Sequence, residues 1–213
     1  MLLPRACPVC GRTGPAPCER CRAELRPARR LPAPLGVDRC VALLDYSGAG
    51  REVVARLKYR NARSSLAYLA EGMARLVDRG DVDVVTWAPT TATRRRQRGF
   101  DHAELLAKAV ARRLRRPARR LLRRLPGPAQ TGRSLAERRR GPLLTARSRS
   151  PARRVLLVDD VVTTGATVSA AATVLREAGA AEVLVVSAAR TLPRRVNSGM
   201  AACGSVVESR GQP

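Results

Sequence analysis

Short apolar runs alternate with amphipathic segments along most of the chain. Four runs have the length and β-branched content of buried strands, at residues 40–44, 82–86, 155–158 and 183–189. Apolar residues at helical spacing predict helices over residues 50–59, 64–78, 101–116 and 168–178. Leu121 and Leu122 add a short strand candidate. This alternation predicts an α/β fold with an open, mainly parallel sheet and flanking helices.

Polar residues follow the third of these strands in a distinctive order. Asp159 and Asp160 stand where the strand is expected to end, and the small residues Thr163, Thr164, Gly165, Ala166 and Thr167 come next. Ligands of open α/β sheets bind at the carboxyl ends of the strands. A loop that enters a helix offers free N–H groups to a phosphate, and carboxylates suit sugar hydroxyls and Mg²⁺. The segment therefore predicts a site for a ribose phosphate.

Composition limits the size and surroundings of this fold. The 213 residues are 45% hydrophobic but only 2% aromatic, so the core must consist of Leu, Val and Ala. One good-sized domain with a small appendage is expected. The first residues lack the apolar core of a signal peptide, and no apolar run reaches the length of a membrane span. We therefore expect a cytoplasmic protein without membrane insertion.

Four of the six cysteines lie at the start of the chain in two Cys-x-x-Cys pairs. Cys7 and Cys10 form the first pair, and Cys18 and Cys21 form the second. Two such pairs can supply four thiolates to one tetrahedral Zn²⁺, and a segment this short would take its folding energy from the metal. A redox pair or unliganded thiols are the alternatives. We expect a structural zinc site.

The net charge of +24 is concentrated in the middle of the chain. Residues 94–154 hold 20 arginines, one lysine and three acidic residues, a net charge of +18 in 61 residues. Such a field attracts phosphates, nucleic acid or an acidic partner. Codon bias accounts for the use of arginine in place of lysine, but it does not account for the shortage of acids.

Changes in composition divide the chain into four parts. A zinc module is expected at residues 1–25, a Pro-rich linker at 26–38, the α/β domain at 39–192 and a disordered tail at 193–213. Inside the domain, residues 126–142 have the polar, Gly- and Pro-rich profile of a mobile loop. After the second strand, Asp101 is expected to cap a helix, with Glu104 completing a capping box.

The order of these motifs resembles one family. The run from Val155 to Val168 is similar to the 5-phosphoribosyl-1-pyrophosphate (PRPP) signature of type I phosphoribosyltransferases. The four cysteines, the Leu-Lys-Tyr triplet at 57–59, the Arg-Gly-Phe run at 98–100 and the Gln-Thr-Gly run at 130–132 stand before it. Together they resemble the ComF family, phosphoribosyltransferase-like proteins associated with competence. Two departures are Thr86-Trp87-Ala88-Pro89 and Asp101-His102, where the family has Val-Pro-Val-Pro-like and Asn-Gln sequences.

The resemblance implies roles for individual residues. Asp159 and Asp160 would hold the ribose hydroxyls and Mg²⁺ as the catalytic pair, and Thr163 to Thr167 would bind the 5-phosphate. A pyrophosphate site would include the following residues: Thr90, Thr91, Ala92, Lys58 and Arg98. A flexible loop containing Gln130 and Arg138 would close over the site.

The resemblance leaves two functions open. The first is a Mg²⁺-dependent phosphoribosyltransferase, or a PRPP-binding enzyme, acting on an unknown nucleophile. The second is a non-catalytic competence protein that binds DNA or a helicase-type partner and keeps a sensory or vestigial PRPP site. The paired acids favour the first function, and the basic segment favours the second.

Overall fold

The computed structural model describes residues 6–57, 63–91, 96, 101–125, 141–147 and 152–192. Its centre is a four-stranded sheet in which every neighbouring pair is parallel. The strand order is β1 (Arg39–Asp45), β6 (Glu182–Arg190), β5 (Arg154–Val162) and β2 (Val84–Trp87). The predicted α/β architecture with an open parallel sheet is confirmed.

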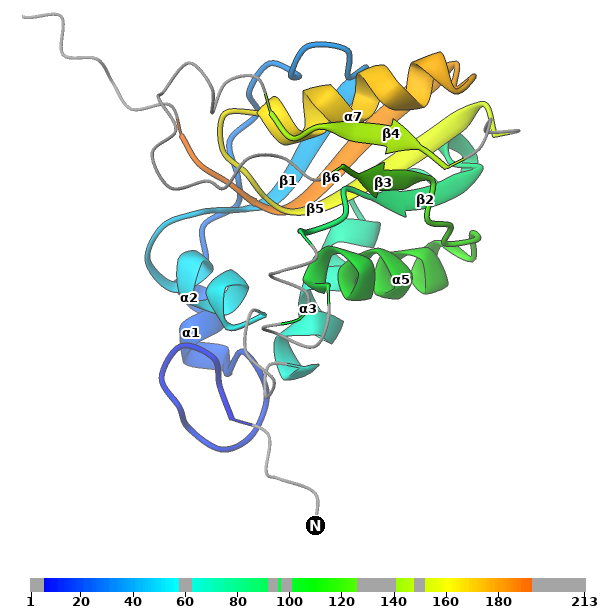
Figure 1. Cartoon of the computed structure of the whole chain (residues 1–213). Coiled ribbons are helices and arrows are strands. Elements are labelled where there is room, and N and C mark those ends of the chain that lie inside the picture. The colour runs from blue at the N-terminus through cyan, green and yellow to red at the C-terminus, as the bar shows by residue number, and fades with distance from the viewer. Residues whose placement is uncertain are drawn as a thin grey trace, which may run out of the picture.

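Helices cover both faces of this sheet (Figure 1). One face carries α7 (Ala166–Glu177), and the other carries α3 (Arg63–Ala74) and α5 (His102–Leu114). The helix α2 (Gly48–Arg56) contacts β1, β6 and α3. Because side chains of a strand alternate between faces, β5 serves both layers. Val155 and Leu157 belong to the α7 cluster, whereas Leu156 and Val158 belong to the α3–α5 cluster.

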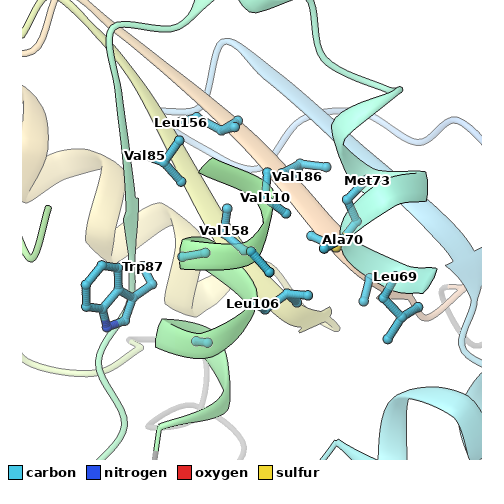
Figure 2. Packing of buried hydrophobic residues seen from close by; sticks show 14 of the residues in the cluster. Leu69, Ala70, Met73, Val85, Trp87, Leu106, Val110, Leu156, Val158 and Val186 are labelled. Carbon is cyan, nitrogen blue, oxygen red and sulfur yellow. The ribbon is translucent and has the colours of Figure 1, made fainter. Parts of the chain in front are cut away.

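The α3–α5 cluster is the larger of the two hydrophobic layers. Figure 2 shows Leu156 and Val158 packed beside Leu106 and Val110 of α5. All four side chains are fully buried. Aliphatic burial of this kind contributes about 1.5–3 kcal/mol for each side chain. The expectation of an aliphatic core holds, with Trp87 as the aromatic exception.

A short antiparallel pair extends the structure beyond the sheet. It consists of β3 (Leu122–Arg124) and β4 (Leu144–Ala146). The second strand was not predicted, because three residues carry too short a pattern to read. The N–H of Leu125 donates to the carbonyl of Leu143 at 3.0 Å, which continues the pairing of the two strands by one further bond.

Several boundaries differ from the prediction. The helix α3 ends at Ala74 rather than Asp78, and the 3₁₀ turn η1 (Arg79–Asp81) leads into β2. The strand β5 continues to Val162, so both aspartates lie within it rather than after it. The reason is the register with β6, which pairs Val162 with Arg190.

The predicted capping box at α5 is wrong. Asp101 is the N-cap, and its Oδ1 accepts from the N–H of Ala103 at 3.1 Å. Glu104 does not reach back to the cap, because its carboxylate binds Lys108 at 2.7 Å one turn further along the helix. The favourable pairing of acid and lysine four residues apart replaces the box.

The segment predicted as a linker packs along the sheet. The N–H of Ala28 donates to the carbonyl of Leu43, and the N–H of Asp45 donates to the carbonyl of Arg26. The segment then crosses toward α7, where Val37 is buried in the α7 cluster. Residues 26–38 therefore contribute contacts to the α/β domain.

An ion pair joins the amino ends of β2 and β5. Asp83 Oδ2 accepts from the backbone N–H of Arg154 at 2.8 Å, and its Oδ1 accepts from Nη2 at 2.7 Å. The side chain and backbone of Arg154 hold the pKa of Asp83 below its usual value. A lowered pKa means that the stabilisation exists at neutral pH and is lost as pH falls through the folded-state pKa.

We expect Asp83→Asn to lower the free energy of unfolding by about 1 kcal/mol at neutral pH, because one charged acceptor is lost. The difference from wild type should shrink below about pH 4, where the unfolded carboxyl group also takes up a proton. Urea unfolding at pH 7 and pH 3.5 measures both values. Asp81→Asn is the matched control, since its pair with Arg39 is exposed. An equal loss in both variants would contradict the prediction.

No helix in the described parts of the chain is long and apolar enough to span a membrane.

Candidate functional site

The two aspartates and the loop after them form one continuous site. Asp159 and Asp160 are half-buried near the end of β5, and α7 starts only a few residues later at Ala166. The loop between them borders a hollow that Asp159 also lines. Thr163 and Thr164 are exposed there. The structure thus brings the acidic pair and the predicted phosphate loop to the same edge of the sheet.

Gly165 determines how this loop enters α7. It is the N-cap residue and has a φ of 80°, a left-handed conformation that favours glycine. A Cβ at this position would also stand 2.8 Å from the ring carbons of Pro34. The left-handed backbone conformation and the contact with Pro34 both require glycine at position 165.

The first turn of α7 presents backbone donors to the hollow. N–H groups at the start of a helix have no partner within the helix, and the dipole there is positive. Thr164 Oγ1 accepts from the N–H of Ala166 at 3.4 Å, which holds the threonine against this turn. An anion with several oxygens, such as a phosphate, suits these donors.

The ionised form of Asp159 is electrostatically unfavourable where it lies beside Asp160. Asp159 Oδ1 accepts from the N–H of Asp160 at 2.8 Å, and Asp160 Oδ1 accepts from the N–H of Val161 at 2.8 Å. Burial raises the pKa of Asp159 well above its usual range, and the charge of Asp160 raises it further. The pair would be relieved by a ligand that supplies hydroxyl donors or a divalent cation.

A third carboxylate connects this site with the loop after β2. Asp101 is buried at 5% exposure, and its Oδ2 accepts from the N–H of Thr90 at 2.9 Å. It also contributes to the raised pKa of Asp159. Two of the predicted pyrophosphate residues, Thr90 and Thr91, are described by the structure. They follow β2 at the carboxyl edge of the sheet, where Asp159 also lies. Sequence reasoning identified Asp101 only as a helix cap, since its second contact is eleven residues away.

Several predicted site residues lie outside the described part of the chain. They are Lys58, Ala92, Arg98, Gln130 and Arg138. One neighbouring contact still locates the end of the predicted flexible loop. A Cβ on Gly141, whose φ is 72°, would stand 2.5 Å from the carbonyl oxygen of Ala166. The chain following residues 126–140 therefore returns against the first turn of α7.

The four N-terminal cysteines form a second candidate site, away from the sheet edge. Their sulfur atoms all lie within 4.8 Å of one another, and the Sγ atoms of Cys10 and Cys18 are 3.7 Å apart. Tetrahedral Zn–S bonds of about 2.3 Å place sulfurs about 3.8 Å apart. The cluster therefore fits a single tetrahedral ion.

The thiols of this cluster differ in acidity. Burial opposes ionisation of Cys7, but hydrogen bonds from the backbone of Cys10, Cys18 and Val9 lower its pKa to about 6. Burial and the neighbouring thiols raise the pKa of Cys21 to about 12. A bound cation would keep all four groups ionised, as zinc ligation requires.

The cysteine module contacts the α/β domain. Its helix α1 (Glu19–Ala23) places Arg22 over the ring of Tyr68 in α3, 5.4 Å from the centroid. Val9 and Leu25 pack against the α3–α5 cluster. The module is therefore docked on the domain by apolar and cation–π contacts.

Comparison with known proteins agrees with this geometry. The family described as phosphoribosyl transferase domain matches residues 102–199. Competence protein F of Haemophilus influenzae is 29% identical over 167 residues, covering 72% of this chain and 73% of that protein. The chain is thus similar to competence protein F over most of both sequences. The resemblance to the ComF family and the phosphoribosyltransferase-like fold are thereby confirmed.

Solved structures give weaker likenesses. Glutamine PRPP amidotransferase from B. subtilis has a TM-score of 0.43 at 24% identity, over 63% of this chain. The chain spans about 30% of the length of that amidotransferase. Purine phosphoribosyltransferase from Pyrococcus horikoshii has a TM-score of 0.39 at 14% identity, over 60% of this chain and 80% of that one. Both TM-scores are low, so the assignment rests on the family match and the homologue.

Proposed function

We propose that this ComF homologue binds PRPP together with Mg²⁺ and transfers its phosphoribosyl group to an acceptor. The observation that supports this most is that Asp159 and the loop from Thr163 to Thr167 line one hollow, with Asp160 next to Asp159 in β5. The loop suits a 5-phosphate, and the carboxylates suit the ribose hydroxyls. The match to the phosphoribosyl transferase domain supports the same ligand.

The reaction would be a displacement at C1 of the ribose. A nucleophile forms the new bond to C1 as the bond to the pyrophosphate oxygen breaks, and the electron pair leaves with pyrophosphate. Positive charge develops on the ribose ring during this step, and the Asp159–Asp160 pair lies where it can stabilise that charge. The Thr163–Thr167 loop would fix the other end of the sugar, so the reacting carbon is held in place.

The acidic pair fits a magnesium ion. Carboxylate oxygens are the hard ligands that Mg²⁺ prefers. Asp159 lines the hollow, and Asp160 follows it in β5. Mg²⁺ would neutralise charge on the departing pyrophosphate. Asp101 would hold the neighbouring loop through the N–H of Thr90, and so keep the pyrophosphate side of the site in position.

A thermal-shift titration with PRPP and MgCl₂ tests the proposal. At a ligand concentration 100 times the dissociation constant, binding should stabilise the protein by about 2.7 kcal/mol. Release of pyrophosphate in the presence of candidate acceptors then separates binding from turnover. Absence of any shift at millimolar PRPP would contradict the proposed ligand.

A second candidate function is contact with nucleic acid, linked to competence for DNA uptake. Several exposed arginines have no ion pair in the described structure: Arg112 on α5, Arg115 and Arg119 after it, Arg123 in β3, Arg147 after β4 and Arg153 before β5. The name of the Haemophilus influenzae homologue points to the same role. These side chains would bind the phosphate backbone, since the described residues around them offer no aromatic stacking platform. The same arginines could instead bind a helicase-type protein that has an acidic surface.

Salt dependence distinguishes backbone binding from other contacts. The logarithm of DNA affinity should fall against the logarithm of salt concentration by about 0.7–0.9 per phosphate contacted. Fluorescence anisotropy with a labelled oligonucleotide measures this slope. Replacing Arg119 and Arg123 by glutamine should reduce the slope by about two, and a flat slope in the wild type would exclude this surface as the DNA site.

A further inference from the structure

Residues 31–36 form a strap across the edge of the sheet that carries the candidate site. Arg190, the last residue of β6, holds one end by donating to the carbonyls of Pro32 at 2.8 Å and Leu31 at 3.4 Å. Arg176 of α7 holds the other end by donating to the carbonyl of Gly36 at 3.1 Å. The strap is therefore fixed at both ends by side chains of the α/β domain.

The middle of the strap lies directly on the phosphate loop. Both Cβ and Cγ of Pro34 stand 2.8 Å from the position that a Cβ on Gly165 would occupy. The proline ring therefore rests against the Cα of the residue that turns the loop into α7. Pro34 also accepts from the N–H of Val37 at 3.1 Å, so a tight turn holds the ring in place.

The exit of the strap is anchored to the same helix that begins at the phosphate loop. Asp38 Oδ2 binds Arg176 Nη2 at 2.5 Å and also accepts from the N–H of Val183 in β6 at 2.7 Å. Gly36 lies against α7, where its Cβ would stand 3.7 Å from that of Ala172. Strap, helix and β6 are thus one connected unit around the loop.

We propose that the strap positions the phosphate loop, with Pro34 as the positioning residue. This inference rests on the proposed function, because the loop is taken to bind the 5-phosphate. Glycine is free to adopt many backbone conformations. The ring of Pro34 removes part of this freedom at Gly165, so the N–H groups of the first turn of α7 stay directed at the phosphate.

The test compares two ligands that report on different parts of the site. Ribose 5-phosphate depends on the phosphate loop, whereas inorganic pyrophosphate depends on the loop after β2. Pro34→Gly should lower the affinity for ribose 5-phosphate by about fivefold or more and leave the affinity for pyrophosphate unchanged. Pro34→Ala, which keeps the Cβ next to Gly165 but removes the Cγ, should show a smaller loss of the same kind. Isothermal titration of the full chain measures both affinities.

A matched control separates positioning from general destabilisation. Pro117→Gly adds the same freedom to the unfolded chain at an exposed loop next to the bridge between Val85 and Ala118, far along the chain from the strap. Its melting temperature should fall as in Pro34→Gly, while its affinity for ribose 5-phosphate should equal that of wild type. Loss of both ligands in Pro34→Gly would indicate a global defect and overturn the inference.

A double-mutant cycle tests the contact itself. Gly165→Ala should abolish ribose 5-phosphate binding, and Pro34→Gly in the same chain should restore part of it, because the ring that excludes the Cβ is gone. Independent losses in the two variants would overturn the inference. If wild type binds ribose 5-phosphate and Pro34→Gly binds it equally well, the positioning role of the strap is wrong but the proposed function stands. A wild type that binds neither ligand would overturn the proposed function together with it.

Discussion

Exchange of Asp159 and Asp160 for asparagine is expected to abolish ligand binding and, at the same time, to raise the melting temperature of the ligand-free protein. Each asparagine keeps an Oδ1 that can accept from the N–H of the following residue, as the aspartate does. The charges that would receive ribose hydroxyls and Mg²⁺ are lost. Affinity for PRPP should fall at least about 100-fold, since two charged hydrogen-bonding groups are removed.

The gain in stability follows from the raised pKa of Asp159. Burial and the neighbouring Asp160 disfavour its ionised form in the fold. A carboxyl group with a raised folded-state pKa loses stabilisation as pH rises through that pKa, so at neutral pH the pair costs stability. The neutral variant avoids this loss, and its advantage over wild type should shrink as pH falls through the raised pKa of Asp159.

Thermal unfolding between pH 4 and pH 8, with and without PRPP and MgCl₂, measures both effects. Glu177→Gln is the control, because it removes an exposed carboxylate at the far end of α7. It should retain the PRPP shift. A double variant that is less stable than wild type at pH 8 would show that the pair serves the fold rather than the ligand.

Loss of the ion that the four cysteines would hold is expected to unfold the cysteine module and to weaken the rest of the protein. We infer that the ion is Zn²⁺, held by Cys7, Cys10, Cys18 and Cys21. The described part of the module, residues 6–25, has one five-residue helix, so the metal would supply most of the folding energy. Its unfolding would expose Val9 and Leu25, which now pack on the α3–α5 cluster.

Cys21→Ser tests this without a chelator that would also remove Mg²⁺. Zinc content should fall from one ion to less than one per chain, and amides of the module should exchange rapidly. The α/β domain should lose about 2 kcal/mol, or roughly 6 °C in melting temperature. Cys40→Ala, in β1 outside the cluster, should keep the zinc. Full zinc content and unchanged exchange in Cys21→Ser would contradict the assignment.

The sequence was most informative where local pattern and tertiary structure agree. The apolar run of β5 and the small residues after it predict a strand, a tight loop and a helix, and the structure contains all three. The pairing of Asp159 and Asp160 with the loop followed because the carboxyl end of one strand holds them together. The residues alone indicated a ribose phosphate as the ligand, and the family resemblance narrowed this to PRPP.

The sequence could not show contacts between residues that lie far apart along the chain. Pro34 reads as part of a linker, because nothing near residue 34 indicates that Gly165 lies beneath it. Asp101 reads as a helix cap, and its bond to the N–H of Thr90 depends on how α5 packs beside β2. Each of these residues has an ordinary local role, and its role in the site exists only in the folded chain.

A crystal structure of the protein with PRPP and MgCl₂ tests the central claim most directly. The account predicts the 5-phosphate against the loop from Thr163 to Thr167 and the ribose hydroxyls on Asp159 and Asp160. Pyrophosphate should lie toward Thr90 and Thr91. PRPP bound elsewhere, or an acidic pair that does not contact the sugar, would contradict the account.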